Sequence, residues 1–220
     1  LQCFTNEYIY EETEEETVAI KNLEVAIQRS FTEGQIISPH DIVCLSAYRP
    51  LYLYTWTHDI KPPAGLETLF ERQLLEPNQE LALREEIPRL KPIENDISLI
   101  VQDQYEENPY PRWVDTNLEF EPLTIAQLIS RLGFKAEGGL NDFSESPQVL
   151  IAGCGTGQQS IGAAARIKNS RVTAIDLSIS SLSYALRKTR EYGILNIDYI
   201  QADILDIGLL NKQFDIVESL

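Results

Sequence analysis

The stretch Val149-Leu150-Ile151-Ala152-Gly153-Cys154-Gly155-Thr156-Gly157 decides the fold of this chain. Four apolar residues run directly into three glycines at alternate positions, and a helix-forming segment follows. A short apolar run of this kind fits a strand buried on both faces, as in the centre of a parallel sheet. Glycines after such a strand allow a sharp turn and the close approach of a ligand. The next helix would then direct its unpaired N–H groups toward that ligand.

The sequence after residue 148 alternates between buried strands and helices. We expect strands at 148–152, 171–176, 197–201 and 214–217, and helices at 158–168 and 178–192. Ser178 is a typical N-cap, and Gly193 is a typical helix stop. This alternation predicts an α/β fold with a doubly wound, Rossmann-like parallel sheet.

The sequence before residue 148 predicts a mainly helical region. Helical spacing of apolar residues occurs at 7–33, in short segments within 34–60, and at 66–86 with an interruption near Pro77-Asn78. Five prolines prevent residues 87–122 from forming one regular element. Residues 124–133 have the pattern of an amphipathic helix closed by a glycine, and a polar linker follows at 137–147.

The net charge of −16 belongs entirely to the N-terminal part of the chain. Residues 1–147 hold 27 acidic and 11 basic side chains, whereas residues 148–220 hold 7 of each. A negative field repels phosphate backbones, so a nucleic-acid substrate is disfavoured. Solvated acidic helix faces that confer solubility are the simpler interpretation of the charge.

The apolar content, the cysteines and the ends of the sequence restrict the class of protein further. The apolar content of 43% is enough for a real core, and no apolar run approaches the ~18 residues of a membrane helix. Three widely spaced cysteines without a CxxC pair indicate a reducing, cytoplasmic location and no metal site. Because the chain starts at Leu1, lacks methionine and ends within a strand-like segment, we expect a piece of a longer protein.

Three features beyond the glycines restrict the class of ligand that this site could bind. Gln158 stands where the dinucleotide fingerprint has its third glycine. Asp176 ends the second strand 19 residues after Gly157, close to the spacing of a carboxylate that accepts hydrogen bonds from ribose hydroxyls. Asp203 follows the third strand, where a carboxylate can accept from an adenine amino group. A dinucleotide does not need this second acid, whereas an adenosine held by its edge does.

This ordered set resembles the class I S-adenosylmethionine-dependent methyltransferases. The matching segments are the glycine turn, Ala174–Ser178, Gln201–Leu205 and Phe214–Glu218. The resemblance implies S-adenosylmethionine as cofactor, with Asp176 on its ribose and Asp203 on its adenine. The implied cofactor-binding residues are Ala152, Gly153, Cys154, Gly155, Thr156, Gly157, Asp176, Leu177, Asp203, Ile204 and Glu218.

The chain departs from this family in two ways. The family has an acid two residues before the first glycine, on the methionine amino group, where this chain has Ile151. The family's sheet has seven strands, so the four expected here leave it incomplete at its C-terminal side. We therefore predict a helical acidic region with a connector or lid at 1–122 and a truncated methyltransferase domain at 123–220.

A second segment, Gln104–Trp113, mixes aromatic and charged residues between prolines. Together with the glycine turn it resembles the junction in bacterial methyltransferases that carry tetratricopeptide repeats upstream, although no repeat is visible here. Such a mixture suits a pocket wall, and a buried connector is the alternative. The candidates for a substrate-binding lid are Tyr105, Glu106, Tyr110, Arg112 and Trp113.

The expected function is methyl transfer to a protein or small-molecule acceptor, with no general base identified in the sequence. The acidic N-terminal region could bind a protein partner. One alternative is a non-catalytic methyltransferase-like module, which Ile151 and the missing strands favour. A second alternative is an NAD-dependent oxidoreductase, which Gln158 and Asp203 disfavour.

Overall fold

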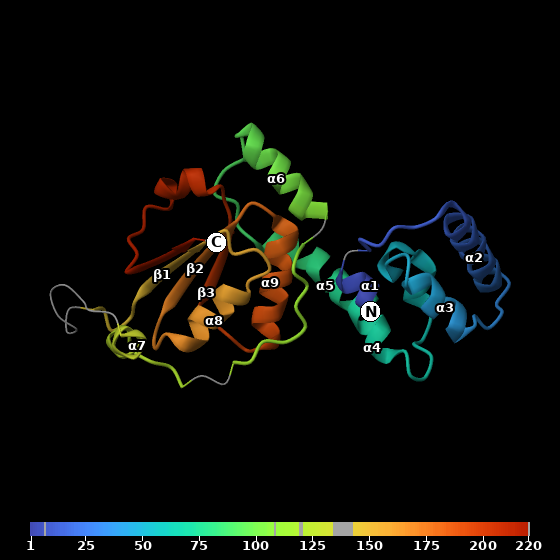
Figure 1. Ribbon diagram of the computed structural model, residues 1–220, viewed down its shortest axis with the longest axis horizontal. Helices are drawn as coiled ribbons and strands as arrows, with labels where there is room; N and C mark the ends of the chain where they lie inside the picture. The colour runs from blue at the N-terminus through green and yellow to red at the C-terminus, as the bar shows by residue number, and fades with distance from the viewer. Residues whose placement is uncertain (7, 108, 119–120, 134–142, 220) are drawn as a thin grey trace. The chain divides into compact units, whose positions relative to one another are not determined.

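The computed structural model describes residues 1–6, 8–107, 109–118, 121–133 and 143–219 (Figure 1). It divides into two compact units, Leu1–Leu81 and Ala82–Leu220. The functional division at residue 122 stays a prediction. None of the described helices is long and apolar enough to cross a membrane.

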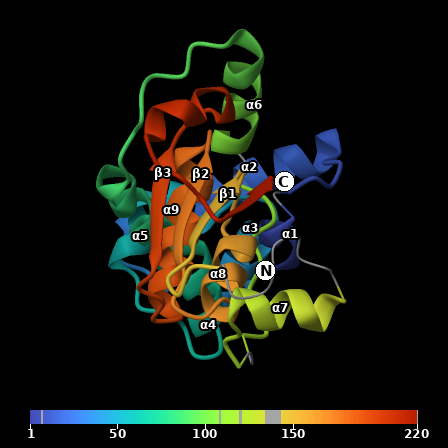
Figure 2. The same cartoon turned by 90° about the vertical axis from the view of Figure 1, so that its left-hand side faces the viewer.

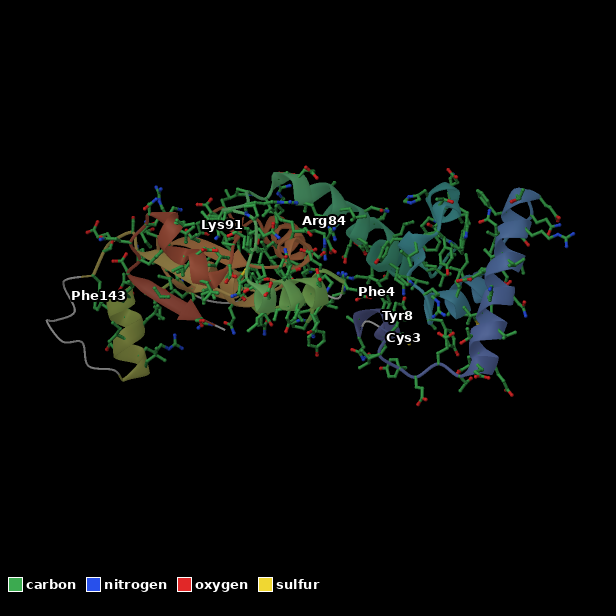
Figure 3. All side chains as sticks on the ribbon, turned by 90° about the horizontal axis from the view of Figure 1, so that it is seen from above. Cys3, Phe4, Tyr8, Arg84, Lys91 and Phe143 are labelled. Atoms are coloured by element: carbon green, nitrogen blue, oxygen red, sulfur yellow. The ribbon has the colours of Figure 1, made fainter. Side chains whose placement is uncertain are left out.

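The first unit is helical. Its elements are α1 (Gln2–Thr5), α2 (Glu14–Thr32), α3 (Pro39–Ser46), η1 (Leu51–Leu53), η2 (Thr55–Asp59), α4 (Glu67–Phe70), η3 (Glu71–Leu75) and the first part of α5 (Glu76–Leu83). Helix α2 begins with a capping box between Thr13 and Glu16, and it buries Ile20 and Ile27. Near α1, the Phe4 and Tyr8 rings meet edge to face with centroids 6.4 Å apart (Figure 3).

The predicted interruption near Pro77 is wrong, because α5 runs through this proline from Glu76 to Leu83. The irregular turn is η3, a π-helical segment that directly precedes it. Proline has no N–H, and its ring conflicts with the carbonyl four residues earlier, at Gln73. A wider turn at this point accommodates the ring without ending the helix.

The second unit is built on a parallel sheet. Its elements are η4 (Arg84–Glu86), α6 (Asp96–Glu107), α7 (Ile125–Leu132), β1 (Gln148–Ala152), α8 (Gln158–Arg166), β2 (Arg171–Asp176), α9 (Ile179–Glu191), β3 (Ile197–Gln201), η5 (Ile204–Leu210) and β4 (Ile216–Ser219). The strand order is β3-β2-β1-β4, and every pair is parallel. The predicted doubly wound α/β fold is confirmed, with the fourth strand two residues later than expected.

The two faces of the sheet are covered by different elements. Val149 and Ile151 face a core formed with α7, α8 and α9, whereas Leu150 and Ala152 face η5 and Leu90. All four side chains are at most 1% exposed, which is why the strand carries no polar residue after Gln148. The chain crosses from β3 through η5 to β4 on the other side of β1, so the strand order reverses at β1.

Helix α6 is an element beyond those expected from the sequence pattern. It lies between Pro92 and Pro109, and Asn95 caps it by accepting hydrogen bonds from the N–H groups of Ile97 and Ser98. Figure 2 shows α6 and η5 at the same end of the sheet, opposite α7. Lys91, just before α6, forms an ion pair with Asp206 of η5 at 3.2 Å (Figure 3).

Helix α7 confirms the amphipathic helix predicted at 124–133. Thr124 and Gln127 form its capping box, and Gly133 ends it in the left-handed conformation. Most of the predicted polar linker lies outside the described residues. Phe143, where the described chain resumes, packs against the same core as Leu128 and Ile129 of α7 and lies near this helix (Figure 3).

Candidate functional site

The glycine turn follows β1 directly and is held against β2. The N–H groups of Gly153 and Cys154 both donate to the carbonyl oxygen of Ile175, at 2.9 and 3.0 Å. Gly153, Gly155 and Gly157 have φ angles of 76°, 51° and 83°, in the left-handed region that favours glycine. The turn therefore has a fixed conformation before any ligand is considered.

Gly157 is also required by a close approach of helix α9. A Cβ atom added to Gly157 would lie 2.5 Å from the Cβ of Ala185 and 2.9 Å from the Tyr199 hydroxyl oxygen. Gly155 differs, because a Cβ there would meet no heavy atom within 4 Å. Glycine is therefore favoured at position 155 by its backbone conformation alone, and at position 157 by both its conformation and the lack of space for a Cβ atom.

Asp176, the last residue of β2, connects the turn to helix α9. Its Oδ2 accepts a hydrogen bond from the Gly155 N–H at 2.8 Å, and its Oδ1 accepts from the Ser178 N–H at 2.9 Å. Removal of the carboxylate from water raises the pKa of Asp176, while these backbone donors act in the opposite direction. A carboxylate has about four lone-pair sites, so both oxygens can still accept from a ligand.

A pocket of about 520 Å³ opens beside this carboxylate. Its wall combines the end of β1, the glycine turn, the start of α8, the end of β2, α9, the end of β3 and α6. The lining residues are Val101, Tyr105, Tyr110, Pro111, Ala152, Gly153, Cys154, Gly155, Thr156, Gln158, Gln159, Asp176, Leu177, Ser181, Ala202 and Ile204. The volume lies in the range typical of small-molecule sites.

Most of the sequence-predicted residues lie on this wall. Those that line it are Tyr105, Tyr110, Ala152, Gly153, Cys154, Gly155, Thr156, Asp176, Leu177 and Ile204. Those that do not line it are Glu106, Arg112, Trp113, Gly157, Asp203 and Glu218. The ligand contacts assigned to either group stay predictions.

Asp203 and Glu218 are the predicted acids outside the lining. Asp203 is 3% exposed, between the lining residues Ala202 and Ile204, and its Oδ1 accepts from the Leu205 N–H at 2.9 Å. This carboxylate therefore caps η5. Glu218 lies exposed on β4 beside Ile151.

Glu106 fixes helix α6 to the N-terminus of α9. Its carboxylate accepts from the N–H groups of Ile179 and Ser180, the latter at 3.2 Å, and from the Ser180 hydroxyl at 2.6 Å. A carboxylate is favoured there by the helix dipole and the unpaired N–H groups. The Ser178 hydroxyl also donates to the Tyr105 carbonyl oxygen at 2.9 Å, so α6 holds Tyr105 at the pocket.

The segment 111–114 forms hydrogen bonds with the glycine turn and with helix α9. The Thr156 hydroxyl donates to the Pro111 carbonyl oxygen at 2.8 Å, and the Trp113 indole N–H donates to the Thr156 carbonyl oxygen at 3.1 Å. Lys188, whose side chain is 0% exposed, donates to the Val114 carbonyl oxygen at 2.8 Å. Its ammonium lies 5.2 Å from the Trp113 ring centroid, a cation–π distance.

The side chains of Arg112 and Cys154 lie against other groups of the protein. The Arg112 guanidinium lies over the Tyr184 ring, 5.7 Å from its centroid. Burial, with the nearby Asp176 charge, raises the pKa of the Cys154 thiol well above its ordinary value. The thiol therefore stays protonated, and only a thiolate is a strong nucleophile.

A comparison of the sequence with known families finds one match, in the C-terminal part of the chain. Residues 149–220 match a family model described as a methyltransferase domain. This segment is therefore similar to methyltransferase domains. The resemblance noted in the sequence is thus confirmed for this segment, while the resemblance to proteins with tetratricopeptide repeats stays a prediction. No curated protein matches the chain.

Solved structures that resemble the chain include several methyltransferases. Magnesium protoporphyrin IX methyltransferase from Synechocystis, with bound S-adenosylhomocysteine, is 19% identical over 55% of this chain and 57% of its own, with a TM-score of 0.38. Haemonchus contortus phosphoethanolamine N-methyltransferase 2, in complex with S-adenosylhomocysteine, is 23% identical over 36% and 18%, with a TM-score of 0.30. A structure concerned with conversion of a disulfide into a thioacetal in echinomycin biosynthesis is 24% identical over 56% and 46%, with a TM-score of 0.37.

Six residues that line the pocket beside Asp176 were not predicted as site residues. They are Val101, Pro111, Gln158, Gln159, Ser181 and Ala202. Helix α6 could have been found from Asn95 as a cap and from the helical spacing of Ile97, Ile100 and Val101. Ser181 has no such pattern in the sequence. Four of the six residues from Ser178 to Ser183 are serines, so the sequence does not distinguish the one that lines the pocket.

Proposed function

We propose that the chain binds S-adenosylmethionine in this pocket and transfers its methyl group to an acceptor. The observation that carries the proposal is Asp176, whose carboxylate is fixed by the glycine turn on a pocket wall of a methyltransferase domain. A carboxylate in this position suits the two hydroxyls of a ribose, because it can accept from both.

The residues present fit an adenosine-containing cofactor at its nucleoside end. Asp176 would hold the ribose, and Leu177 and Ile204 offer apolar surface on the same wall. Asp203 supports the adenine contact through its carboxylate, because the cap of η5 uses one of its lone-pair sites. At the amino-acid end, Ile151 is 0% exposed inside the sheet, so Gln158 and Gln159 are the polar side chains that would contact this end.

The chain's part in the reaction would be placement of the reactants. When bound, the cofactor supplies a methyl group already activated by its sulfonium, so in-line orientation provides much of the barrier reduction. The glycine turn and Asp176 would fix the nucleoside, while Tyr105 and Tyr110 would wall the pocket against water. Among the described lining residues Asp176 is the one carboxylate, so no separate general base is assigned.

The acceptor that we propose is a protein or a small molecule rather than a nucleic acid. The supporting observation is the charge of the chain, because residues 1–147 carry the whole net charge of −16. This field would repel a phosphate backbone and could guide a basic protein partner to the N-terminal region. Three free cysteines support a reducing, cytoplasmic location.

A second candidate is a cofactor-binding module without activity. Ile151 favours it, because the amino-acid end of S-adenosylmethionine would lack its usual acidic partner. The module would bind S-adenosylhomocysteine and S-adenosylmethionine without methylating any acceptor. An NAD-dependent oxidoreductase remains the third candidate, and it predicts binding of NAD instead.

Calorimetric titration of the chain with S-adenosylmethionine, S-adenosylhomocysteine and NAD separates these candidates. We expect binding of the first two, and Asp176→Ala should weaken both by about 100-fold or more, since hydrogen bonds to a charged group are worth roughly 1.5–3 kcal/mol each. Asp198→Ala, at an exposed acid on β3, is the matched control and should bind normally. Binding of NAD alone, or full affinity in Asp176→Ala, would overturn the proposal.

A further inference from the structure

Ser181 is a lining residue of the pocket with an unused hydroxyl. It lies in the first turn of α9, is 1% exposed, and its backbone N–H donates to the Ser178 hydroxyl oxygen at 3.0 Å. Its Oγ has no hydrogen-bond partner among the residues that the structure describes. Buried polar groups in native proteins are almost always paired, so this exception needs a physical reason.

The neighbouring serines all use their hydroxyls. Ser178 donates to the Tyr105 carbonyl oxygen, and Ser180 donates to the Glu106 carboxylate. Ser183, also 1% exposed, donates to the Ser180 carbonyl oxygen at 2.9 Å. The hydroxyls at the serine-rich start of α9 are therefore paired with one exception, and the exception belongs to a residue of the pocket wall.

The usual acceptor for a helical serine is already occupied at this position. A serine within a helix often donates to the carbonyl four residues earlier, which for Ser181 is Leu177. The Leu177 carbonyl oxygen accepts from the Gln201 side-chain amide at 2.8 Å and from the Gln102 amide at 3.1 Å. Because a carbonyl oxygen has two lone pairs, no site remains on it for the Ser181 hydroxyl.

We infer that the Ser181 hydroxyl hydrogen-bonds the nucleoside part of the ligand, as a specificity residue beside Asp176. The inference rests on the proposed function. It places Ser181 at the nucleoside because the N-cap of its helix is Ser178, whose N–H donates to the Asp176 carboxylate. A hydroxyl can both donate and accept, so it complements a carboxylate that can only accept. The Gln102 and Gln201 amides contribute indirectly by keeping the Leu177 carbonyl occupied.

The test compares Ser181→Ala with Ser183→Ala, using adenosine and S-adenosylhomocysteine as ligands. Ser181→Ala should weaken binding of both by the same factor, about three- to ten-fold, which is the net value of one hydrogen bond. Its melting temperature without ligand should equal or exceed that of the parent, because it removes an unpaired buried hydroxyl. Ser183→Ala should lower the melting temperature and leave both affinities unchanged.

The other outcomes have distinct meanings. Parent-like affinity of Ser181→Ala for both ligands, with Asp176→Ala defective, overturns this inference and leaves the proposed function standing. Weaker binding of S-adenosylhomocysteine alone places Ser181 at the amino-acid end and overturns the nucleoside assignment. A melting temperature of Ser181→Ala as low as that of Ser183→Ala shows a structural hydroxyl, which also overturns it. If the parent chain binds neither ligand, the proposed function and this inference both fail.

Discussion

Replacement of Gly157 by alanine tests the account of the glycine turn. The new Cβ would lie 2.5 Å from the Ala185 Cβ and 2.9 Å from the Tyr199 hydroxyl oxygen, on a backbone with φ of 83°. Overpacking of a core costs about 1–3 kcal/mol, and a left-handed conformation costs an alanine roughly 1–2 kcal/mol. The lower entropy of the unfolded alanine variant returns about 0.4–1 kcal/mol. We expect a net loss of about 2–4 kcal/mol.

Gly155→Ala is the matched control for this substitution. Its φ of 51° is also positive, but the added Cβ would meet no atom within 4 Å, so only the conformational cost applies. We expect a loss of about 1 kcal/mol or less for this variant. In a thermal unfolding experiment the two predictions correspond to decreases of roughly 5–15 °C for Gly157→Ala and about 2–4 °C for Gly155→Ala.

A double variant separates the steric part of the cost from the conformational part. Ala185→Gly removes the atom that the new Cβ would meet first. Combined with Gly157→Ala, it should cost less than the sum of the two single changes, because the two positions are in contact. Equal melting temperatures for Gly157→Ala and Gly155→Ala, or strict additivity in the double variant, would refute the close-approach argument.

Three further predictions concern charged groups. Because burial raises the pKa of Asp176 above 3.8, affinity for S-adenosylhomocysteine should rise as pH increases through the window above 3.8, and Asp176→Asn should lose this trend. The contribution of Asp176 to ligand-free stability should fall over the same window, measured as the difference in unfolding free energy between the parent chain and Asp176→Asn, because carboxyls with lowered pKa values, such as Glu12 and Glu86, act in the opposite sense. Lys188→Met should lower the unfolding free energy by about 2 kcal/mol in urea, whereas the exposed control Lys168→Met should change it by less than about 0.5 kcal/mol. Glu106→Gln should weaken the α6 attachment by about 1 kcal/mol, seen as faster amide exchange in residues 96–107, and the exposed Glu107→Gln should not. Unchanged exchange in Glu106→Gln, or equal effects of the two lysine changes, would contradict these contacts.

The elements that could be predicted from the sequence are those in which burial, backbone conformation or helix capping determines the residue type at each position. Val149 to Ala152 are apolar at every position, because the strand is buried on both faces. The glycines after it have positive φ angles, which favour glycine. Thr124 and Ser178 accept hydrogen bonds from backbone N–H groups at the starts of their helices, as is typical of N-cap residues. Alternation of such elements then leaves few possible sheet orders.

The remainder depends on contacts between distant positions. Nothing near Glu106 shows that its carboxylate caps a helix that begins more than seventy residues later. Ser181 is a comparable case, since its free hydroxyl follows from two amides that occupy a neighbouring carbonyl. These features come from tertiary packing and have no local sequence pattern. Helix α6 was different, because its cap and its apolar spacing were present in the sequence.

The bond between Trp113 and the glycine turn gives the protein an optical reporter of its own. The chain has two tryptophans, and Trp113 alone belongs to the second unit. Its indole N–H donates to the carbonyl oxygen of Thr156, which is itself a lining residue of the pocket. In a Trp56→Phe background, emission from this one indole would follow events at the glycine turn without a dye. Ligand association could then be followed by stopped-flow fluorescence on the time scale of binding itself.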